Sequence, residues 1–254
     1  MEIDCSKYRM KYDLHTHTTY SHGFIKPHGK GTMEENVRAA IDAGLDGIAI
    51  SDHGPGHIFY GLKRQLLPEM HEEIQRLRKA YPQIDIYFSV EANLMESGNN
   101  LDVSPEEISD YDFILAGYHY GVFHGHCMAN FMNNKKLSGR SVRDKLLELN
   151  TEMAVGAIRK NKIKVLTHPG DKGPFDIHEI AKACADAGTL MEISTWHSHL
   201  TVEEIKIAMK EDVQFIISSD AHTPNRVGSF TGGLMRAAEA GLDLNRIVNV
   251  EEIR

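Results

Sequence analysis

The hydrophobic and polar positions of this 254-residue chain follow two recurring patterns. Short runs of apolar, often β-branched residues predict buried strands, and longer stretches with amphipathic helical spacing lie between most of them. Seven runs predict strands, at residues 10–15, 47–51, 86–91, 113–117, 163–168, 190–194 and 213–219. Strands that alternate with helices predict parallel βαβ units.

Helix boundaries can be predicted from capping residues. Thr32-Met-Glu-Glu35 has the form of a capping box, and Gly44 is a typical stop for the helix that follows it. Further helices are predicted at residues 62–80, 141–160, 176–187, 201–210 and 231–240. Seven βα units suit an α/β barrel, closed or nearly closed, with one unit missing or distorted. A barrel of this length is normally one domain, here residues 1–254.

Residues 120–140 resemble neither a strand nor a helix. The segment is rich in His, Asn and Gly, and we expect a long loop. A loop of this length is either functional or mobile, so both a lid over a pocket and a plain surface excursion stay open.

Composition narrows the class of protein. Hydrophobic residues make up 41% and charged residues 25% of the chain, as in ordinary globular proteins. The sequence has no apolar run near 18 residues, which predicts no transmembrane helix, and its N-terminus lacks the features of a signal peptide. The three cysteines are odd in number and far apart in the sequence, so they do not indicate a set of disulfides. We therefore expect the protein in a reducing compartment, the cytoplasm. The net charge of −8 makes a long nucleic acid an unlikely partner.

Histidine is unusually abundant, with 15 residues, and many of them follow predicted strands. Six of the seven predicted strands are followed by His, Asp or Glu at or near their C-terminal ends. These residues are His15, His17, His22, Asp52, His53, Glu91, His119, His168, Asp220 and His222. In a parallel barrel the C-terminal ends of the strands share one rim, where barrel active sites lie. His71 and His178 lie on predicted helices and are expected at the surface.

This set of residues predicts a metal centre with more than one ion. Its ligands offer nitrogen and oxygen but no thiolate, which suits Zn²⁺ or Mn²⁺, with Fe²⁺ as an alternative. Nine of these ten residues, all except Asp52, are counted as candidate ligands, which is too many for one ion and suits two or three. Glu91 and Asp220 are the expected bridges, because a carboxylate has two oxygens and an imidazole has one free lone pair.

The segments DLHTH, SDHG, VEAN, GYH, THPG and SSDAH together resemble the PHP (polymerase and histidinol phosphatase) metallo-phosphoesterases, most closely the small stand-alone bacterial phosphatases. The resemblance extends over nearly the whole chain. It implies a distorted (β/α)7 TIM-like barrel with three divalent metal ions at the C-terminal rim of the strands.

The resemblance also assigns ligands. It implies a first ion at His15, His17, Glu91 and Asp220, a second at Glu91, His119 and His168, and a third at His22, His53 and His222. The spacing from His17 to His22 is short, and members of the family vary here. Asp13 and Asp52 match acids of the family, and we expect them to orient imidazoles.

The expected reaction is hydrolysis of a small phosphate monoester through a metal-bridging hydroxide, with Glu91 and Asp220 as catalytic residues. Asp220 or a nearby histidine would protonate the leaving group. Arg226, Lys172 and His197 are candidate substrate contacts, although a surface position would equally explain each of them.

Other functions stay open at this point. Within the family they are a histidinol-phosphate phosphatase of histidine biosynthesis and a PHP-type nuclease. Outside it they are an amidohydrolase, which would normally carry a lysine at a strand end, and a non-catalytic metal-binding module. The sequence leaves the physiological substrate, the native metal and the oligomeric state open.

Overall fold

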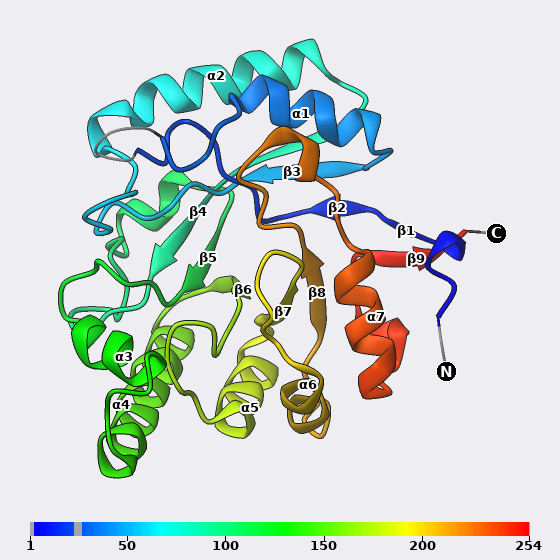
Figure 1. The fold of residues 1–254 in the computed structure, drawn as a ribbon. Helices are drawn as coiled ribbons and strands as arrows, with labels where there is room; N and C mark the ends of the chain where they lie inside the picture. The colour runs from blue at the N-terminus through cyan, green and yellow to red at the C-terminus, as the bar shows by residue number, and fades with distance from the viewer. Residues whose placement is uncertain (1–2, 23–26, 254) are drawn as a thin grey trace.

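The computed structural model describes residues 3–22 and 27–253. Within these residues, seven parallel strands form one sheet in sequence order. They are β2 (Tyr12–Asp13), β3 (Gly47–Ile50), β4 (Asp85–Asn93), β5 (Phe113–Gly117), β6 (Ile163–Leu166), β7 (Leu190–Ser194) and β8 (Phe215–Ser218). The sheet curls into a nearly closed barrel (Figure 1). The predicted distorted (β/α)7 TIM-like barrel is therefore confirmed.

A seam between β2 and β8 closes the barrel. Thr16 and Ala221, just past these strands, form a single parallel bridge. Below it, the fully buried side chain of Asn249 connects the two strands. Its Nδ2 donates to the carbonyls of Tyr12 (2.8 Å) and Ile217 (2.7 Å), and its Oδ1 accepts from Ile217 N (3.1 Å). One amide side chain thus replaces part of the missing strand pairing.

The helices lie outside the barrel (Figure 1). They are α1 (Met33–Asp42), α2 (Leu67–Ala80), α3 (Cys127–Asn134), α4 (Arg140–Lys160), α5 (Ile177–Ala187), α6 (Val202–Ala208) and α7 (Thr231–Ala240). Thr32 and Thr201 form capping boxes, and Asp176 caps α5 through its side chain. The predicted boundaries agree with these helices to within a few residues, apart from the first turn of α2.

One expectation about the chain's connections is wrong. Residues 120–140 are not one long loop, because α3 lies within them. Its buried side chain is Asn130, which exchanges hydrogen bonds with Asn150 of α4 at 3.0 and 2.9 Å. The apolar periodicity that marks a helix is weak here because the buried contact is polar. The distortion of the barrel lies between β4 and β5, where residues 94–112 form a 3-10 helix at Glu107–Asp110 and no α-helix.

The two ends of the described chain form a small sheet that the sequence did not predict. The strands β1 (Tyr8–Met10) and β9 (Val250–Glu252) pair antiparallel, beside the barrel seam (Figure 1). The predicted run at residues 10–15 is consequently split, and its first part joins this outer sheet rather than the barrel.

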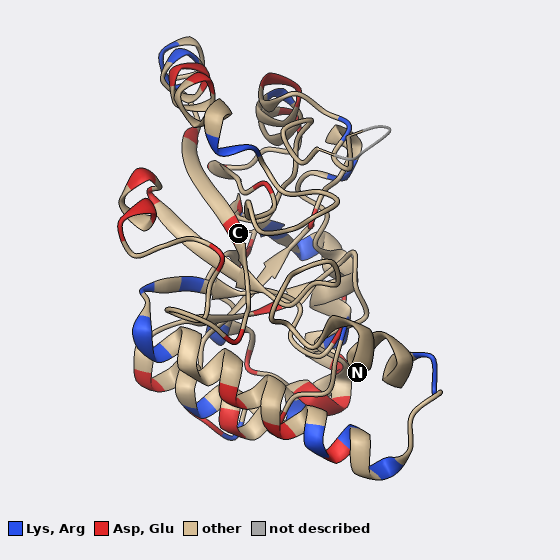
Figure 2. Cartoon of the chain, turned by 90° about the vertical axis from the view of Figure 1, so that its left-hand side faces the viewer, with Lys and Arg blue, Asp and Glu red and all other residues tan. Residues whose placement is uncertain are grey.

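Apolar side chains pack in two clusters. The larger lies between the barrel and its helices, and the smaller contains buried residues on or beside six barrel strands: Leu14, Ala49, Leu115, Val165, Leu190 and Ile216. Basic and acidic residues alternate along the outer helices in the view of Figure 2, which shows no continuous basic stripe. No helix within the described residues combines the length and apolar character needed to cross a lipid bilayer.

Candidate metal centre

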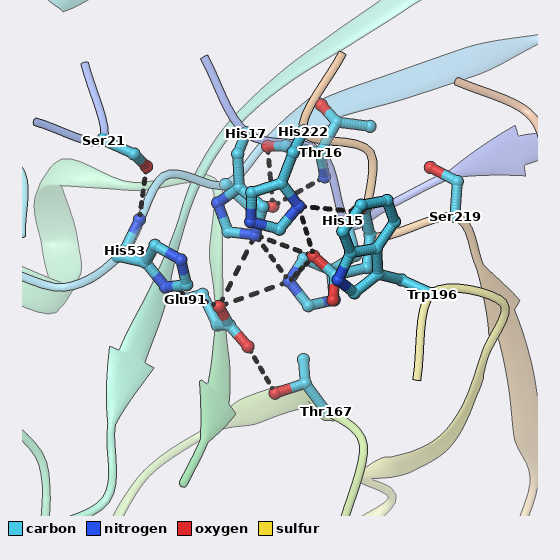
Figure 3. A network of polar contacts seen from close by, with 12 residues as sticks. His15, Thr16, His17, Ser21, His53, Glu91, Thr167, Trp196, Ser219 and His222 are labelled. Atoms are coloured by element: carbon cyan, nitrogen blue, oxygen red, sulfur yellow. Dashed lines mark hydrogen bonds and ion pairs between the residues drawn. The ribbon is translucent and has the colours of Figure 1, made fainter. Parts of the chain in front are cut away.

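Buried histidines and carboxylates converge at the C-terminal rim of the barrel. Figure 3 shows the imidazoles of His15, His17 and His53 around the carboxylate of Glu91. His119 follows β5, His168 follows β6, and Asp220 and His222 follow β8. All eight of these side chains are buried. The structure therefore brings together eight of the nine ligands expected from the sequence.

Glu91, near the end of β4, lies at the middle of this cluster. Its Oε1 is 3.0 Å from His168 Nε2 and 3.4 Å from His119 Nε2. Its Oε2 is 3.0 Å from His53 Nδ1 and 3.3 Å from His15 Nε2. The two oxygens thus face different pairs of imidazoles, which is the arrangement that a bridging carboxylate requires.

Asp220 forms the second acidic point of the cluster. Its Oδ1 lies 3.1 Å from His17 Nε2, 3.4 Å from His222 Nδ1 and 3.6 Å from His15 Nε2. Its backbone φ of 49° and that of His168, 27°, lie in the left-handed region that non-glycine residues rarely adopt. Such backbone strain is typical of functional sites, where the surrounding structure holds it in place.

The pKa values of both carboxylates and of His17 lie well below their usual values. Burial alone would raise the pKa of Glu91, but the imidazoles of His119 and His15 hold it well below its usual value. Asp220 behaves in the same way beside His15 and His17. The pKa of His17 is lowered well below its usual value by burial and by the neighbouring imidazoles of His53 and His222. Ionised carboxylates beside a neutral imidazole such as that of His17 are the forms that bind metal ions.

The donor set fits divalent cations. Four combinations of these side chains bring three ligand atoms within 4.8 Å of one another: His15/His17/Asp220, His17/His53/His222, His15/Glu91/His168 and His53/Glu91/His119. Glu91 Oε2, Asp220 Oδ1, His222 Nε2 and both ring nitrogens of His53 are buried without a hydrogen-bond partner among the described residues. Buried polar atoms normally have a partner, so these atoms are suited to bind an ion.

Two buried side chains hold the imidazoles in orientation. His15 Nδ1 donates to Glu192 Oε1 and His119 Nδ1 donates to Asn93 Oδ1, each at 2.8 Å. Both contacts leave the Nε2 lone pair directed toward Glu91 and are of the kind that tunes metal ligands. Sequence reasoning missed both residues. Glu192 had a signal, because it is an acid in the middle of the apolar strand β7.

Asp13 and Asp52 do not have the role expected from the sequence. Asp52 accepts hydrogen bonds from Thr18 and Ser21, through both their backbone N–H groups and their hydroxyls. Asp13 accepts from the backbone N–H groups of His15, Ser219 and Gly228. Asp13 is the last residue of β2 and Asp52 lies two residues past β3, so the donors nearest to each belong to segments outside the strands. They fix the loops that carry ligands rather than the imidazoles themselves.

The structure does not bring His22 to the cluster. His22 lines a separate hollow with Glu69 of α2, and it belongs to none of the candidate metal groups found among the described residues. His28 lies close instead, with its ring centroid 4.3 Å from that of His222 and 5.4 Å from that of His53. Burial and these imidazoles lower the pKa of His28 to about 3. Sequence reasoning had no basis for preferring His28 to His22, because the two histidines lie only six positions apart.

A cavity of about 440 Å³ opens over the cluster. Lys172 and His197, two of the three expected substrate contacts, line it. His197 Nε2 lies 3.2 Å from Asp220 Oδ2, and its Nδ1 lies 3.2 Å from Asp171 Oδ2. The third contact, Arg226, is not among the described residues that line the cavity. Its guanidinium lies over the ring of Trp196, 4.9 Å from the ring centroid.

Comparison with known proteins identifies the family. The PHP domain profile matches residues 13–196 of the chain. The chain belongs to the PHP domain family. A probable phosphatase of this kind from Thermoanaerobacter sp. (strain X514) is 27% identical over 96% of the chain and 91% of its own length. One from Shewanella halifaxensis (strain HAW-EB4) is 25% identical over 94% of the chain and 89% of its own length.

A solved structure supports the PHP fold. Histidinol phosphate phosphatase from Lactococcus lactis subsp. lactis Il1403, crystallised with zinc, L-histidinol and phosphate, is similar with a TM-score of 0.59. The similarity covers 92% of this PHP chain and 95% of that protein. At 16% sequence identity it supports the fold and does not identify a substrate.

Proposed function

We propose that this chain is a metal-dependent phosphatase that hydrolyses small phosphate monoesters. One observation carries the proposal: Glu91 and Asp220 are buried carboxylates that each face several imidazoles. Each turns one oxygen, without a hydrogen-bond partner among the described residues, toward those rings. The family of the chain and the names of its relatives support the reaction class.

Three divalent ions, Zn²⁺ or Mn²⁺, are the proposed complement. His15, His17 and Asp220 would hold one. Glu91, His119 and His168 would hold a second, because both imidazoles face Glu91 Oε1. His53 and His222 would hold the third, with His28 rather than His22 as the nearby histidine. Elemental analysis of reconstituted protein should give three ions per chain. A value of one would contradict this assignment, because most of the buried ligands would then have no partner.

When bound, divalent ions at this centre would supply positive charge for the phosphate oxygens and acidify a water molecule. The negatively charged carboxylates of Glu91 and Asp220 lie between the imidazoles and would offset the positive charge of the ions. Lys172, paired with Asp171 at the cavity wall, adds a positive charge beside the position of the phosphate. The water oxygen bonds to phosphorus as the bond from phosphorus to the alcohol oxygen breaks, and the alcohol takes up a proton.

His197 is the side chain we assign as the proton donor. Burial opposes its charged form, but contacts with Asp171 and Asp220 outweigh burial and raise its pKa to about 9. The imidazole lines the cavity between these two carboxylates, which favour its protonated form. His197→Gln should slow hydrolysis of alkyl phosphates more than that of p-nitrophenyl phosphate, whose leaving group needs little protonation. Equal slowing of both substrates would show that His197 has another role.

A substrate panel tests the proposal as a whole. Enzyme reconstituted with Zn²⁺ or Mn²⁺ should cleave p-nitrophenyl phosphate and small alcohol phosphates, lose activity with chelator and recover it with metal. Its kcat/KM should be much lower on bis-(p-nitrophenyl) phosphate and single-stranded DNA, because a diester carries one negative charge where a monoester carries two. Faster turnover of the diester or DNA would favour a nuclease. Turnover of an amide or lactone alone would favour an amidohydrolase.

A further inference from the structure

Aromatic side chains surround the cavity above the candidate metal centre. We call Phe59, Tyr60, Tyr120, Phe131 and Trp196 the aromatic wall, because all five line the same cavity. They come from three connections, which follow β3, β5 and β7. These strands alternate around the barrel, so the aromatic wall approaches the centre from three sides.

The aromatic wall is not explained by core packing. Trp196 is 49% exposed, Phe59 is 47% exposed and Phe131 is 44% exposed. Large aromatic side chains are usually more deeply buried, as Phe88 and Phe215 are in this chain. Exposed apolar rings that converge on one cavity mark a surface that a ligand covers.

Contacts with other residues hold the rings in place. The ring of Tyr60 lies nearly parallel to His28 at 4.0 Å and to His57 at 4.8 Å. Phe131 meets the ring of Tyr120 edge to face at 5.7 Å. The guanidinium of Arg226 lies over Trp196 at 4.9 Å. A flat group that enters the cavity would therefore meet rings that are already oriented, which limits the ordering cost of binding.

The charges of the cavity exclude one class of alcohol. Asp220 is the one carboxylate among the described residues that line the cavity, and it already contacts His17 and His222. An ammonium group on the substrate would find no free acid and would lie near the cation of Lys172. Burying an unpaired charge is costly. The cavity is thus poorly suited to amino-alcohol phosphates.

From these observations we infer that the site prefers phosphate monoesters of uncharged aromatic alcohols, with the ring of the substrate against the aromatic wall. The inference rests on the proposed phosphatase activity and narrows its substrate class. The phosphate would lie at the centre formed by Glu91 and Asp220, and the ring would lie outward between Trp196 and Phe131.

Two matched substrates test this inference in the full-length, metal-reconstituted enzyme. Benzyl phosphate and cyclohexylmethyl phosphate are similar in size and in leaving-group reactivity, and they differ in whether the ring is flat and aromatic. We expect kcat/KM to be roughly tenfold higher for benzyl phosphate, mainly through a lower KM, as one or two aromatic contacts would give. Calorimetry with 2-phenylethylphosphonate and 2-cyclohexylethylphosphonate should give a similar ratio of affinities without turnover.

Single substitutions test whether the aromatic wall causes the preference for benzyl phosphate. Trp196→Ala should bring the ratio of benzyl to cyclohexylmethyl phosphate close to one, whereas Trp196→Phe should keep most of it. Phe123→Ala is the matched control, because Phe123 is 71% exposed and does not belong to the described lining of the cavity. That variant should leave the ratio unchanged.

The outcomes separate the two proposals. If no phosphate ester is hydrolysed, the proposed phosphatase activity fails. If monoesters are hydrolysed but the ratio is near one in the wild type, the activity stands and the aromatic preference is wrong. Preference for phosphoethanolamine or L-histidinol phosphate over benzyl phosphate would also overturn the inference, because it would mean that the site recognises an amine.

Discussion

The two oxygens of Glu91 face different pairs of imidazoles in the cluster. Thr167 Oγ1 also donates a hydrogen bond to Glu91 Oε1, at 2.6 Å. A carboxylate between two cations offsets their mutual repulsion, whereas a terminal imidazole binds one ion. Its loss should therefore affect more of the centre than the loss of a single histidine.

Glu91→Ala should remove more than one ion per chain and lower kcat/KM by more than about 100-fold, since even residues that only orient ligands are worth 10- to 100-fold. His53→Ala should remove one ion and leave the others bound. Elemental analysis and zinc titration of both variants measure the difference. Loss of one ion from each would show that Glu91 does not bridge.

His57 should make the stability of the folded protein depend on pH. Its Nδ1 accepts hydrogen bonds from the backbone N–H groups of Phe59 (3.2 Å) and Tyr60 (3.0 Å), so the folded state needs the neutral ring. Burial, together with the imidazoles of His53 and His119, lowers its pKa to about 2. Between that value and the unfolded pKa near 6.5, the unfolded chain binds the extra proton. The stabilising contribution of His57 is therefore complete above pH 6.5 and declines as the pH falls.

At pH 5 this loss amounts to about 2 kcal/mol, since each pH unit below 6.5 costs about 1.4 kcal/mol. His57→Asn keeps an acceptor but does not titrate. Urea unfolding in chelator from pH 8 to pH 5 should show a shallower decline for His57→Asn than for the wild type. Parallel curves would mean that the folded protein tolerates a protonated His57.

At the scale of strands and helices, much of the architecture can be predicted because local rules and tertiary packing agree. The capping boxes at Thr32 and Thr201 mark helix starts, and the apolar runs mark barrel strands. Candidate ligands at strand ends could be predicted because parallel strands share one rim. The position of His28 beside His53 and His222 could not be predicted, because neither His22 nor His28 lies at the end of a strand.

Sequence reasoning did not predict α3, β1 and β9, because each depends on contacts with residues far away in the sequence. α3 buries an asparagine against α4, so its sequence lacks an apolar face. β1 and β9 are short and pair over nearly the full length of the chain. Their sequences carry no local signal of that pairing.

The strand β5 approaches the metal centre so closely that only glycine fits at its end. A Cβ on Gly117 would lie 2.7 Å from Glu91 Oε1 and 2.9 Å from His119 Cε1, and would also meet the hydroxyl of Thr167. Gly117→Ala should displace Glu91 and reduce the number of bound ions with little change in helix content.

Gly232→Ala in α7 is the matched control, because its added Cβ meets no described atom within 4 Å. It should keep its metal and gain slightly in stability, as an alanine within a helix does. Zinc titration and circular dichroism of both variants make the comparison. Full metal content in Gly117→Ala would show that the centre can shift to accept a methyl group.

For the molecule as a whole, closure of the barrel depends in part on Asn249, together with the bridge between Thr16 and Ala221. Asn249→Ala would leave Ile217 N–H and two carbonyl groups short of partners in a buried place. Unsatisfied buried groups cost about 1–3 kcal/mol each, and we expect a total loss near 3 kcal/mol because the carbonyls keep part of their bonding. Urea unfolding in chelator measures this loss.

Asn245→Ala is the matched control for the seam. Asn245 is exposed, and its side chain donates locally to Asp243. Its replacement should change the free energy of unfolding by less than about 0.5 kcal/mol. Similar losses in both variants would mean that the seam does not depend on the Asn249 amide.

The same seam has a consequence for the synthesis of the protein. Asn249 lies 237 positions after Tyr12, whose carbonyl accepts a hydrogen bond from its side chain. Chains emerge from the ribosome in order from the N-terminus, so the edge of β2 that faces β8 stays unpaired until β8 and Asn249 have been translated. His15 and His17 wait with it for Asp220 and His222. A nascent chain therefore completes the candidate metal centre only after β8 and the residues that follow it have been translated.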